Sequence, residues 1–317
     1  MNDLEQVEPV SDDELNQHCC LESVDRVSDD PETTAFKRRA RLHQALWRER
    51  KSLPVGVNPR CPTEKLGSCM DIEFARKSGN NFLNDAVKNA VHHRIEHRED
   101  AQMIDENRLY GNLLSSMPMC FNLFGSLHDN PALNEQAIHR WWPDVVGEVS
   151  PPRFEWSPGR KDPEYLDNRS AFDVAFEIQM ENGQQGIIGI ETKYHEHCKR
   201  EKLPNENRRK RYEEVTKKSN IFKPDAVKQI LGNDLQQIWL DHLLALSMLQ
   251  HSPQQWHWVK FVLVHPARNP SYAKAAERYS KLLSNTATFE VRTIESLLDA
   301  QALPLTTVAA FRERYFL

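Results

Sequence analysis

The chain has 317 residues, of which 39% are hydrophobic and 27% charged, and its formal net charge is −5. This length and composition fit one large domain, or one core with an appended region. No apolar stretch reaches the length needed to cross a bilayer, and the N-terminus lacks the basic start and apolar centre of a secretory signal, so we expect a soluble cytoplasmic protein with no membrane partner.

Acidic residues are concentrated at the N-terminus. Residues 1–35 hold eleven Asp or Glu and one basic residue, Arg26, for a net charge of −10, which leaves +5 for the rest. An acidic, proline-containing segment of low hydrophobicity is expected to be a disordered leader. Such a leader can dock a partner protein or compete with nucleic acid for a basic surface. The six cysteines form no CxxC pair, which favours reduced thiols over a zinc knuckle.

A helical region is predicted to follow the leader over residues 36–104. Apolar spacing predicts helices over 36–51 and 70–98. Between them, residues 53–67 carry three prolines and two glycines and are predicted to form a loop. The remaining residues, 105–317, are predicted to form the main domain.

Strands and helices alternate along the main domain. The patterns predict helices over 106–127, 131–142, 224–250, 271–283 and 306–315, and strands over 145–159, 171–179, 186–194 and 258–266. The Asn182-Gly183 pair predicts a hairpin turn between the second and third strands. This order predicts an α/β core with a central mixed sheet flanked by helices.

Two acids and a lysine lie on the two strands of this hairpin. Side chains alternate along a strand, so Glu191 and Lys193 share one face and Thr192 points away. The hairpin brings Asp173 beside them. Two carboxylates at a sheet edge can hold Mg²⁺ (or Mn²⁺), with the Thr192 backbone carbonyl as a further ligand. A metal held in this way activates water for phosphodiester hydrolysis, and Lys193 can orient that water or offset phosphate charge.

An ordinary solvent-facing strand is the alternative interpretation, because an ExK triplet alone is common. The context favours a site. Glu191 follows the apolar run Ile187–Ile190, and Asp173 is flanked by Phe172 and Val174. Charged residues beside buried strands are usually paired or bind metal.

The combined pattern resembles the PD-(D/E)XK nuclease superfamily, which has the restriction-endonuclease-like fold. The resemblance rests on SAFDVAFE and GIIGIETKYHE, with SSMPMCFNLFGSL before them and LQQIWLDHLLALSM after them, and covers residues 105–265. It implies a metal-dependent DNA endonuclease in which Asp173 and Glu191 bind the metal and Lys193 is catalytic. A context of restriction or phage defence is implied by the resemblance alone.

The family also has an acid that precedes the motif, and some branches have a glutamine on the following helix. Glu155 and Glu135 are the candidates for the acid, and Glu155 is favoured because it lies immediately before a Pro-Gly loop. Gln237 or Gln229 can match the glutamine, although glutamine on a helix is usually a surface residue.

Basic residues occur in two segments near the motif and are candidates for nucleic-acid contacts. They are Arg160, Lys161 and Arg169 in the loop before Asp173, and Arg208, Arg209 and Arg211 in the segment after Lys193. Solvated surface charge is the alternative for both. DNA is the expected partner, and a homodimer is left open. Two further functions also stay open: a nuclease fold that binds nucleic acid or a partner without cleavage, and a nuclease subunit of a multi-protein system.

Overall fold

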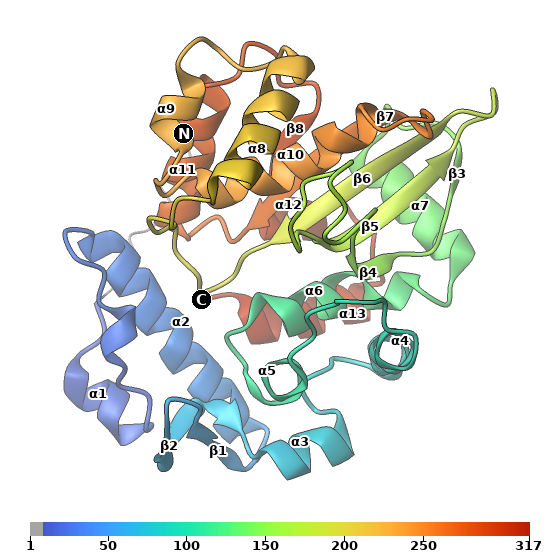
Figure 1. Cartoon of the computed structure of the whole chain (residues 1–317). Helices are drawn as coiled ribbons and strands as arrows, with labels where there is room; N and C mark the ends of the chain where they lie inside the picture. Colours follow the sequence, from blue (N-terminus) through green and yellow to red (C-terminus); the bar gives the residue numbers. More distant parts are fainter. Residues whose placement is uncertain (1–8) are drawn as a thin grey trace.

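The computed structural model describes residues 9–317, and its centre is a mixed six-stranded sheet (Figure 1). The strands are β3 (Glu148–Val149), β4 (Arg153–Trp156), β5 (Phe172–Gln179), β6 (Gln185–Thr192), β7 (Trp256–His265) and β8 (Phe289–Thr293). The order is β3-β5-β6-β7-β8, and β4 pairs separately with β5. β5 and β6 are antiparallel, whereas β6, β7 and β8 are parallel. The predicted α/β fold is confirmed.

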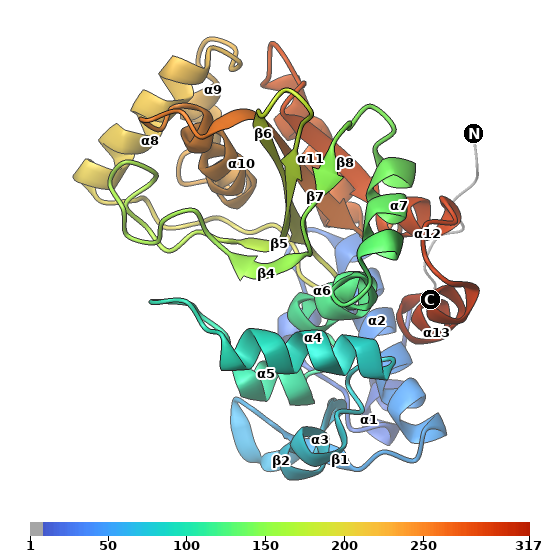
Figure 2. The same ribbon diagram turned by 90° about the vertical axis from the view of Figure 1, so that its right-hand side faces the viewer.

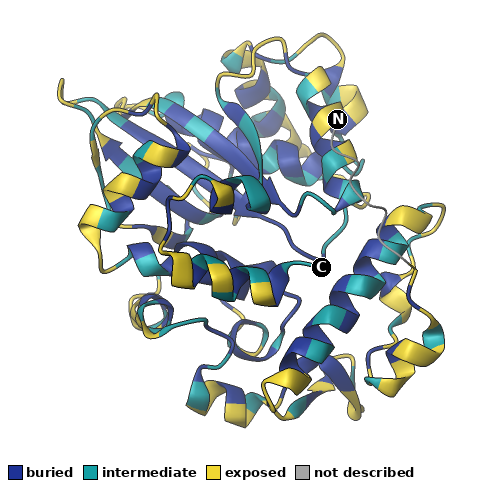
Figure 3. Cartoon of the chain, turned by 180° about the vertical axis from the view of Figure 1, so that it is seen from behind, coloured by how far each residue is buried: buried dark blue, intermediate teal, exposed yellow. Residues whose placement is uncertain are grey.

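Helices cover both faces of the sheet (Figures 1 and 2). One apolar cluster includes residues of α4 (Asp85–Glu96), α5 (Glu106–Gly111), α6 (Ser116–Phe124), α7 (Pro131–Trp141), α12 (Ile294–Asp299) and α13 (Leu305–Tyr315). The other includes residues of α8 (Glu206–Ser219), α9 (Ala226–Ile230), α10 (Gln236–Leu249) and α11 (Pro270–Lys281). Figure 3 shows exposed residues on the outer sides of these helices and buried residues facing inward.

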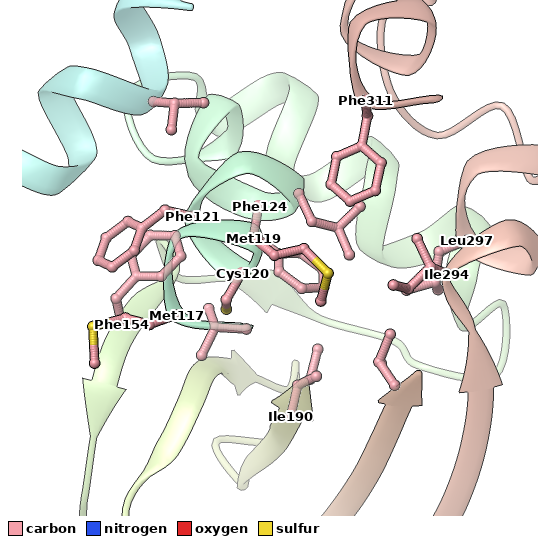
Figure 4. Packing of buried hydrophobic residues seen from close by; sticks show 14 of the residues in the cluster. Met117, Met119, Cys120, Phe121, Phe124, Phe154, Ile190, Ile294, Leu297 and Phe311 are labelled. Atoms are coloured by element: carbon pink, nitrogen blue, oxygen red, sulfur yellow. The ribbon is translucent and has the colours of Figure 1, made fainter. Parts of the chain in front are cut away.

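Strand β6 is buried on both faces, which explains its continuous apolar sequence. Ile188 and Ile190 belong to the first cluster, and Ile187 belongs to the second. In Figure 4, Ile190 lies on the side of the sheet covered by Met119 and Cys120 of α6. Burial of each such side chain contributes about 1.5–3 kcal/mol, so α6 and α10 hold the motif strand firmly between them.

The N-terminal module, which we define as residues 9–70, lies below the sheet in Figure 1. It contains α1 (Asp12–Gln17), the 3-10 turn η1 (Ser23–Asp25), α2 (Pro31–Arg50), and a hairpin of β1 (Val55–Asn58) and β2 (Cys61–Met70). α3 (Ile72–Ser78) follows it and ends at Gly79, whose φ of 63° stops the helix. The module is therefore an αβ unit beside the main sheet and not a purely helical region.

Residues 9–35 are ordered, which differs from the expected disordered leader. Leu15 is fully buried, and the Gly67 N–H donates to the Cys19 carbonyl at 2.7 Å. A side chain at Gly67 would lie 2.1 Å from the His18 carbonyl oxygen, so the two segments are in close contact. Composition missed this because a few well-placed apolar residues and paired charges are enough to dock an acidic segment. Residues 1–8 of the expected leader lie outside the described residues.

Several element boundaries also differ from the sequence predictions. The predicted loop over 53–67 forms the β1–β2 hairpin, and the predicted helix over 70–98 is divided into α3 and α4. The predicted helix over 224–250 is likewise divided into α9 and α10. Proline and glycine were interpreted as loop signals, whereas here they shape a tight hairpin packed on α2.

Three helices begin at an Asx-Pro pair. Asp30, Asn130 and Asn269 each accept a hydrogen bond from the backbone N–H three residues on, and proline follows each. The side chain satisfies an otherwise free N–H, and proline suits the first helical position. Among the helices of residues 9–317, none combines the length and apolarity required to cross a membrane.

Candidate active site

Three acids lie in a row across three adjacent strands. In the antiparallel register Phe154 pairs with Val174 and Trp156 with Phe172, which places Glu155 opposite Asp173. Val174 pairs with Ile190, which places Asp173 opposite Glu191. Directly opposite residues in antiparallel strands project to the same face, so the sheet itself gathers the three carboxylates. The sequence prediction that Asp173 and Glu191 lie on neighbouring strands agrees with this arrangement.

Lys193 is the cation beside this row. Its Nζ lies 2.6 Å from Glu191 Oε1, and 8% of its side chain is exposed. Its backbone N–H donates to the Val264 carbonyl at 2.8 Å, which extends the β6–β7 pairing past the end of β6. The ammonium also lies 5.8 Å from the centre of the Tyr272 ring. Packing and pairing thus fix both ends of the Lys193 side chain.

Thr192 contributes differently from its prediction. We expected it to point away and to offer its backbone carbonyl to a metal. Its N–H and its hydroxyl instead both donate to Asp173 Oδ2, at 2.8 and 2.7 Å. These bonds fix the orientation of the Asp173 carboxylate. A role for the Thr192 carbonyl as a metal ligand stays a prediction.

Glu155 has a strained backbone. Its φ of 48° is uncommon for a residue other than glycine. Its carbonyl accepts a hydrogen bond from Gln102 at 2.9 Å and another from Arg160. Strain of about 1–3 kcal/mol at one residue persists only where surrounding contacts impose it, and such residues concentrate at functional sites. The geometry therefore favours Glu155 as the additional acid, whereas Glu135 is exposed on α7 and does not line the site.

The carboxylates oppose one another's ionisation. Burial, together with the charge of Asp173, raises the pKa of Glu155 to about 8 and that of Glu191 well above its usual value. Burial also raises the pKa of Asp173. Burial alone would lower the pKa of Lys193, but the adjacent Glu191 outweighs it and raises this pKa. The site thus has an excess of negative charge that one ammonium does not neutralise.

Two further acids approach this site, and the sequence analysis did not identify them. Asp241 lies on α10 with 8% of its surface exposed, and burial, offset in part by Lys193, raises its pKa to about 7. Glu196 accepts hydrogen bonds from the Ser116 hydroxyl at 2.9 Å and from the Tyr194 N–H. Asp241 follows Gln237 by four residues and so lies on the same helix face, a spacing that could have indicated it.

Gln237 joins the site, and Gln229 does not. The Gln237 amide nitrogen lies 3.4 Å from Glu191 Oε1, a long hydrogen bond, and Gln237 lines the pocket above the acids. Gln229 is exposed on α9. The structure therefore separates two glutamines that the sequence left as alternatives.

The six predicted basic contacts lie apart from the pocket around the acids, and none of them lines it. Arg160 pairs with Glu99, and Arg209 pairs with Glu213. Arg208 donates to the Asp167 carbonyl, and Arg211 to the Tyr165 carbonyl. Lys161 and Arg169 are exposed. Several of these arginines therefore hold the loop before β5 against α8, and their contact with nucleic acid stays a prediction.

A second charged cluster joins the N-terminal module to the end of the motif. Asp25 is 1% exposed, lies 2.9 Å from His195 Nε2, and accepts hydrogen bonds from the guanidinium of Arg41. These contacts with His195 and Arg41 lower the pKa of Asp25 despite its burial. Sequence analysis missed this cluster because its members are far apart in the chain.

The oxygens of the row fit a hard divalent cation. Hydrogen bonds engage Oδ2 of Asp173 and Oε1 of Glu191, and each carboxylate has a second oxygen. Mg²⁺ keeps several waters and needs only one or two protein carboxylates. Within residues 9–317 no three His, Cys, Asp or Glu side chains are already arranged as a metal site. Asp173 and Glu191, with Glu155 beside them, are the residues that would hold such an ion.

The chain was compared with models of known protein families. The family model described as the PD-(D/E)XK nuclease superfamily matches residues 28–317, which includes α2 and every strand of the main sheet. Neither the curated proteins nor the solved structures contain a match to the chain.

Proposed function

Because the chain belongs to the PD-(D/E)XK nuclease superfamily, we propose that it is a metal-dependent DNA endonuclease that hydrolyses phosphodiester bonds. One observation carries the proposal: the row of Glu155, Asp173 and Glu191 beside the desolvated ammonium of Lys193. Negative charge is gathered here at a cost that a bound divalent cation would offset.

The residues have distinct roles in this proposal. A bound Mg²⁺ or Mn²⁺ would supply Lewis acidity and a more acidic water. Two hydrogen bonds from Thr192 fix Oδ2 of Asp173, and its second oxygen would be the one offered to the cation. Lys193, buried beside Glu191, would offer its positive charge to the attacking water or to the phosphate, and its low exposure would strengthen that interaction. Glu155, with its pKa of about 8, can hold or release a proton near neutral pH.

Two other functions are compatible with the same fold, and the chemistry of the site residues distinguishes them from the proposed one. A module that only binds nucleic acid gains nothing from a strained Glu155 or from a lysine buried beside a carboxylate. A nuclease subunit of a larger system would use the same residues, and the acidic N-terminal segment is the surface that we propose for its partner. A role in restriction or phage defence stays a prediction.

Cleavage assays test the proposal directly. The full chain is incubated with supercoiled plasmid, linear duplex, single-stranded DNA and RNA, in Mg²⁺, in Mn²⁺ or in EDTA. We expect cleavage of DNA with either metal, none in EDTA, and none by Glu191→Gln with any metal. Absence of cleavage by the parent chain on every substrate would overturn the proposal, and preference for RNA would overturn its choice of DNA.

A further inference from the structure

The acids lie at the floor of a pocket and not on an open surface. The pocket has a volume of about 590 Å³. Glu191 and Lys193 are 8% and 6% exposed, so a phosphate must enter the pocket to reach them. One wall comes from the main domain and includes Arg108, Ser116 and Tyr272.

The N-terminal module forms the opposite wall. Lys37 and Arg41 of α2 line the pocket, together with Arg60 and Ser68 from the hairpin β1–β2. Figure 2 shows the hairpin on the far side of α4, α5 and α6 from the sheet. The active site therefore lies between two regions that are distant in the chain, and a substrate must pass between them.

This second wall is fixed in place. Three side-chain contacts join the module to the segment immediately after Lys193: Asp25 to His195 at 2.9 Å, Lys37 to His197 at 3.1 Å, and Gln44 to Tyr194 at 2.9 Å. Gln44 is fully buried and also donates to the Arg314 carbonyl at 2.6 Å. Separation of the two walls would break all three contacts and remove both partners of the Gln44 amide, Tyr194 and the Arg314 carbonyl, so the wall does not open as a loose flap.

The rim of the pocket carries cations on both walls. Arg60 on the module has 56% of its side chain exposed, and Arg108 on the main domain has 42% exposed. Each already contacts one glutamate, Glu22 or Glu196. Half-exposed guanidiniums on facing walls can contact successive phosphates of one strand.

Resting on the proposed nuclease function, we propose that the substrate is single-stranded DNA, which enters between the N-terminal module and the main domain. A duplex is stiff over a persistence length of about 50 nm and does not bend into a walled pocket. A single strand is flexible, and its phosphates can reach a recessed centre while the bases turn outward. The substrate is selected by whether it can enter the pocket, which requires no contact with particular bases. Cleavage is therefore expected at many sequences.

Matched substrates of one sequence test this inference. The full chain is given a circular single strand, which has no ends, and a relaxed, covalently closed circular duplex, which has neither ends nor unpaired loops. We expect the single-stranded circle to be cut at least ~10-fold faster than the closed duplex. Equal rates on the two substrates would overturn the inference and leave the nuclease function standing.

A binding arm distinguishes this inference from the proposed function. Lys193→Ala with Ca²⁺ is titrated with the same two substrates, so that affinity is measured without cleavage. Tighter binding of the single strand supports the inference even if the parent cuts neither substrate, and equal or tighter binding of the duplex overturns it.

A wall variant gives a second readout. Arg60→Ala is expected to weaken single-strand binding about 3- to 10-fold and to lower the slope of its salt dependence by about one. Arg312→Ala is the matched control, because Arg312 is a half-exposed, ion-paired arginine on α13 that does not line the pocket. Equal effects of the two variants would overturn the proposed path along the wall.

Discussion

Two buried charged clusters lie close together in this protein and are built in opposite ways. In the Asp25 cluster, one carboxylate has both Arg41 and His195 as partners, and its pKa is lowered. In the acid row, burial and the charge of Asp173 raise the pKa values of Glu155 and Glu191, although arginines lie near Glu155 and Lys193 lies beside Glu191. The first cluster has its charges matched, and the second has too many carboxylates for its cations.

This difference separates a structural ion pair from a binding site. Matched buried charges stabilise the arrangement that they join. Here Asp25 joins η1 to α2 through Arg41, and it joins the N-terminal module to the end of the motif through His195. A cluster with unmatched charge destabilises the free protein and is relieved by a ligand of opposite sign. Perturbed carboxylates in a pocket are therefore a physical indication of function, independent of family.

The largest expected effect is on catalysis. Lys193→Ala removes the cation that faces the phosphate, so single-turnover cleavage should fall at least ~10³-fold, equivalent to about 4 kcal/mol in the barrier. Metal and DNA affinities should change little, because lysine is not a metal ligand and one phosphate contact is modest. The control is Lys281→Ala, an exposed lysine on α11. Cleavage at the parent rate by Lys193→Ala would show that the catalytic centre is elsewhere.

The second-largest effect is on stability, when the matched Asp25 cluster is disrupted. Asp25→Asn leaves Arg41 buried without its counter-charge, so denaturant unfolding should show a loss of about 3–5 kcal/mol. Asp85→Asn on α4 is the control, because the Asp85 side chain is 91% exposed and its ion pair with Lys88 is at the surface. Its cost should stay below about 1 kcal/mol. Similar costs for the two variants would contradict the matched-pair description.

In the acid row, removal of a carboxylate should stabilise the protein, whereas in the Asp25 cluster it destabilises the protein. Asp173→Asn retains an acceptor for Thr192 and removes one charge, so without metal it should stabilise the protein by about 1 kcal/mol. The parent should gain about 2.7 kcal/mol when Mg²⁺ or Mn²⁺ is present at 100 times its Kd. That gain should be absent in Asp173→Asn. An equal gain in both proteins, measured by thermal unfolding, would place the metal away from the row.

The smallest effect concerns pH. The pKa of Asp241 is raised from 3.8 to about 7, so between these values the folded protein keeps a proton that the unfolded chain has released. Stability without metal should therefore fall as the pH rises from 4 to 7, by at most about 1.4 kcal/mol per pH unit for this group. Asp241→Asn should flatten the fall and add about 1 kcal/mol at pH 8.

Asp234→Asn is the comparison for this measurement. Its hydrogen bond to Arg278 lowers the pKa of Asp234, so the stabilising charge is present above the usual carboxyl range and is lost as the pH falls. The Asn variant should therefore be slightly less stable at pH 8, by about 0–1 kcal/mol, because this pair is partly exposed. A shift of the same sign for both variants would contradict the assignment of Asp241 to the crowded site.

The sequence by itself determined the motif strands and the face of the sheet on which their side chains lie. Alternation placed Glu191 and Lys193 on one face, and the Asn182-Gly183 turn predicted the hairpin that brings Asp173 opposite Glu191. These inferences succeeded because strand periodicity and short turns depend on neighbouring residues alone. The α/β fold class followed from the order of such local patterns.

Only the tertiary structure decided which other residues join the site. The choice of Glu155 over Glu135 depends on how β4 pairs with β5. The choice of Gln237 over Gln229 and the presence of Asp241 depend on how α10 lies beside Glu191. The ordered conformation of residues 9–35 depends on contacts such as the one between Asp25 and His195. These two residues are 170 positions apart in the chain. Long-range packing and charge pairing of this kind leave no periodic trace in the sequence, because the partners are brought together only by the folded chain.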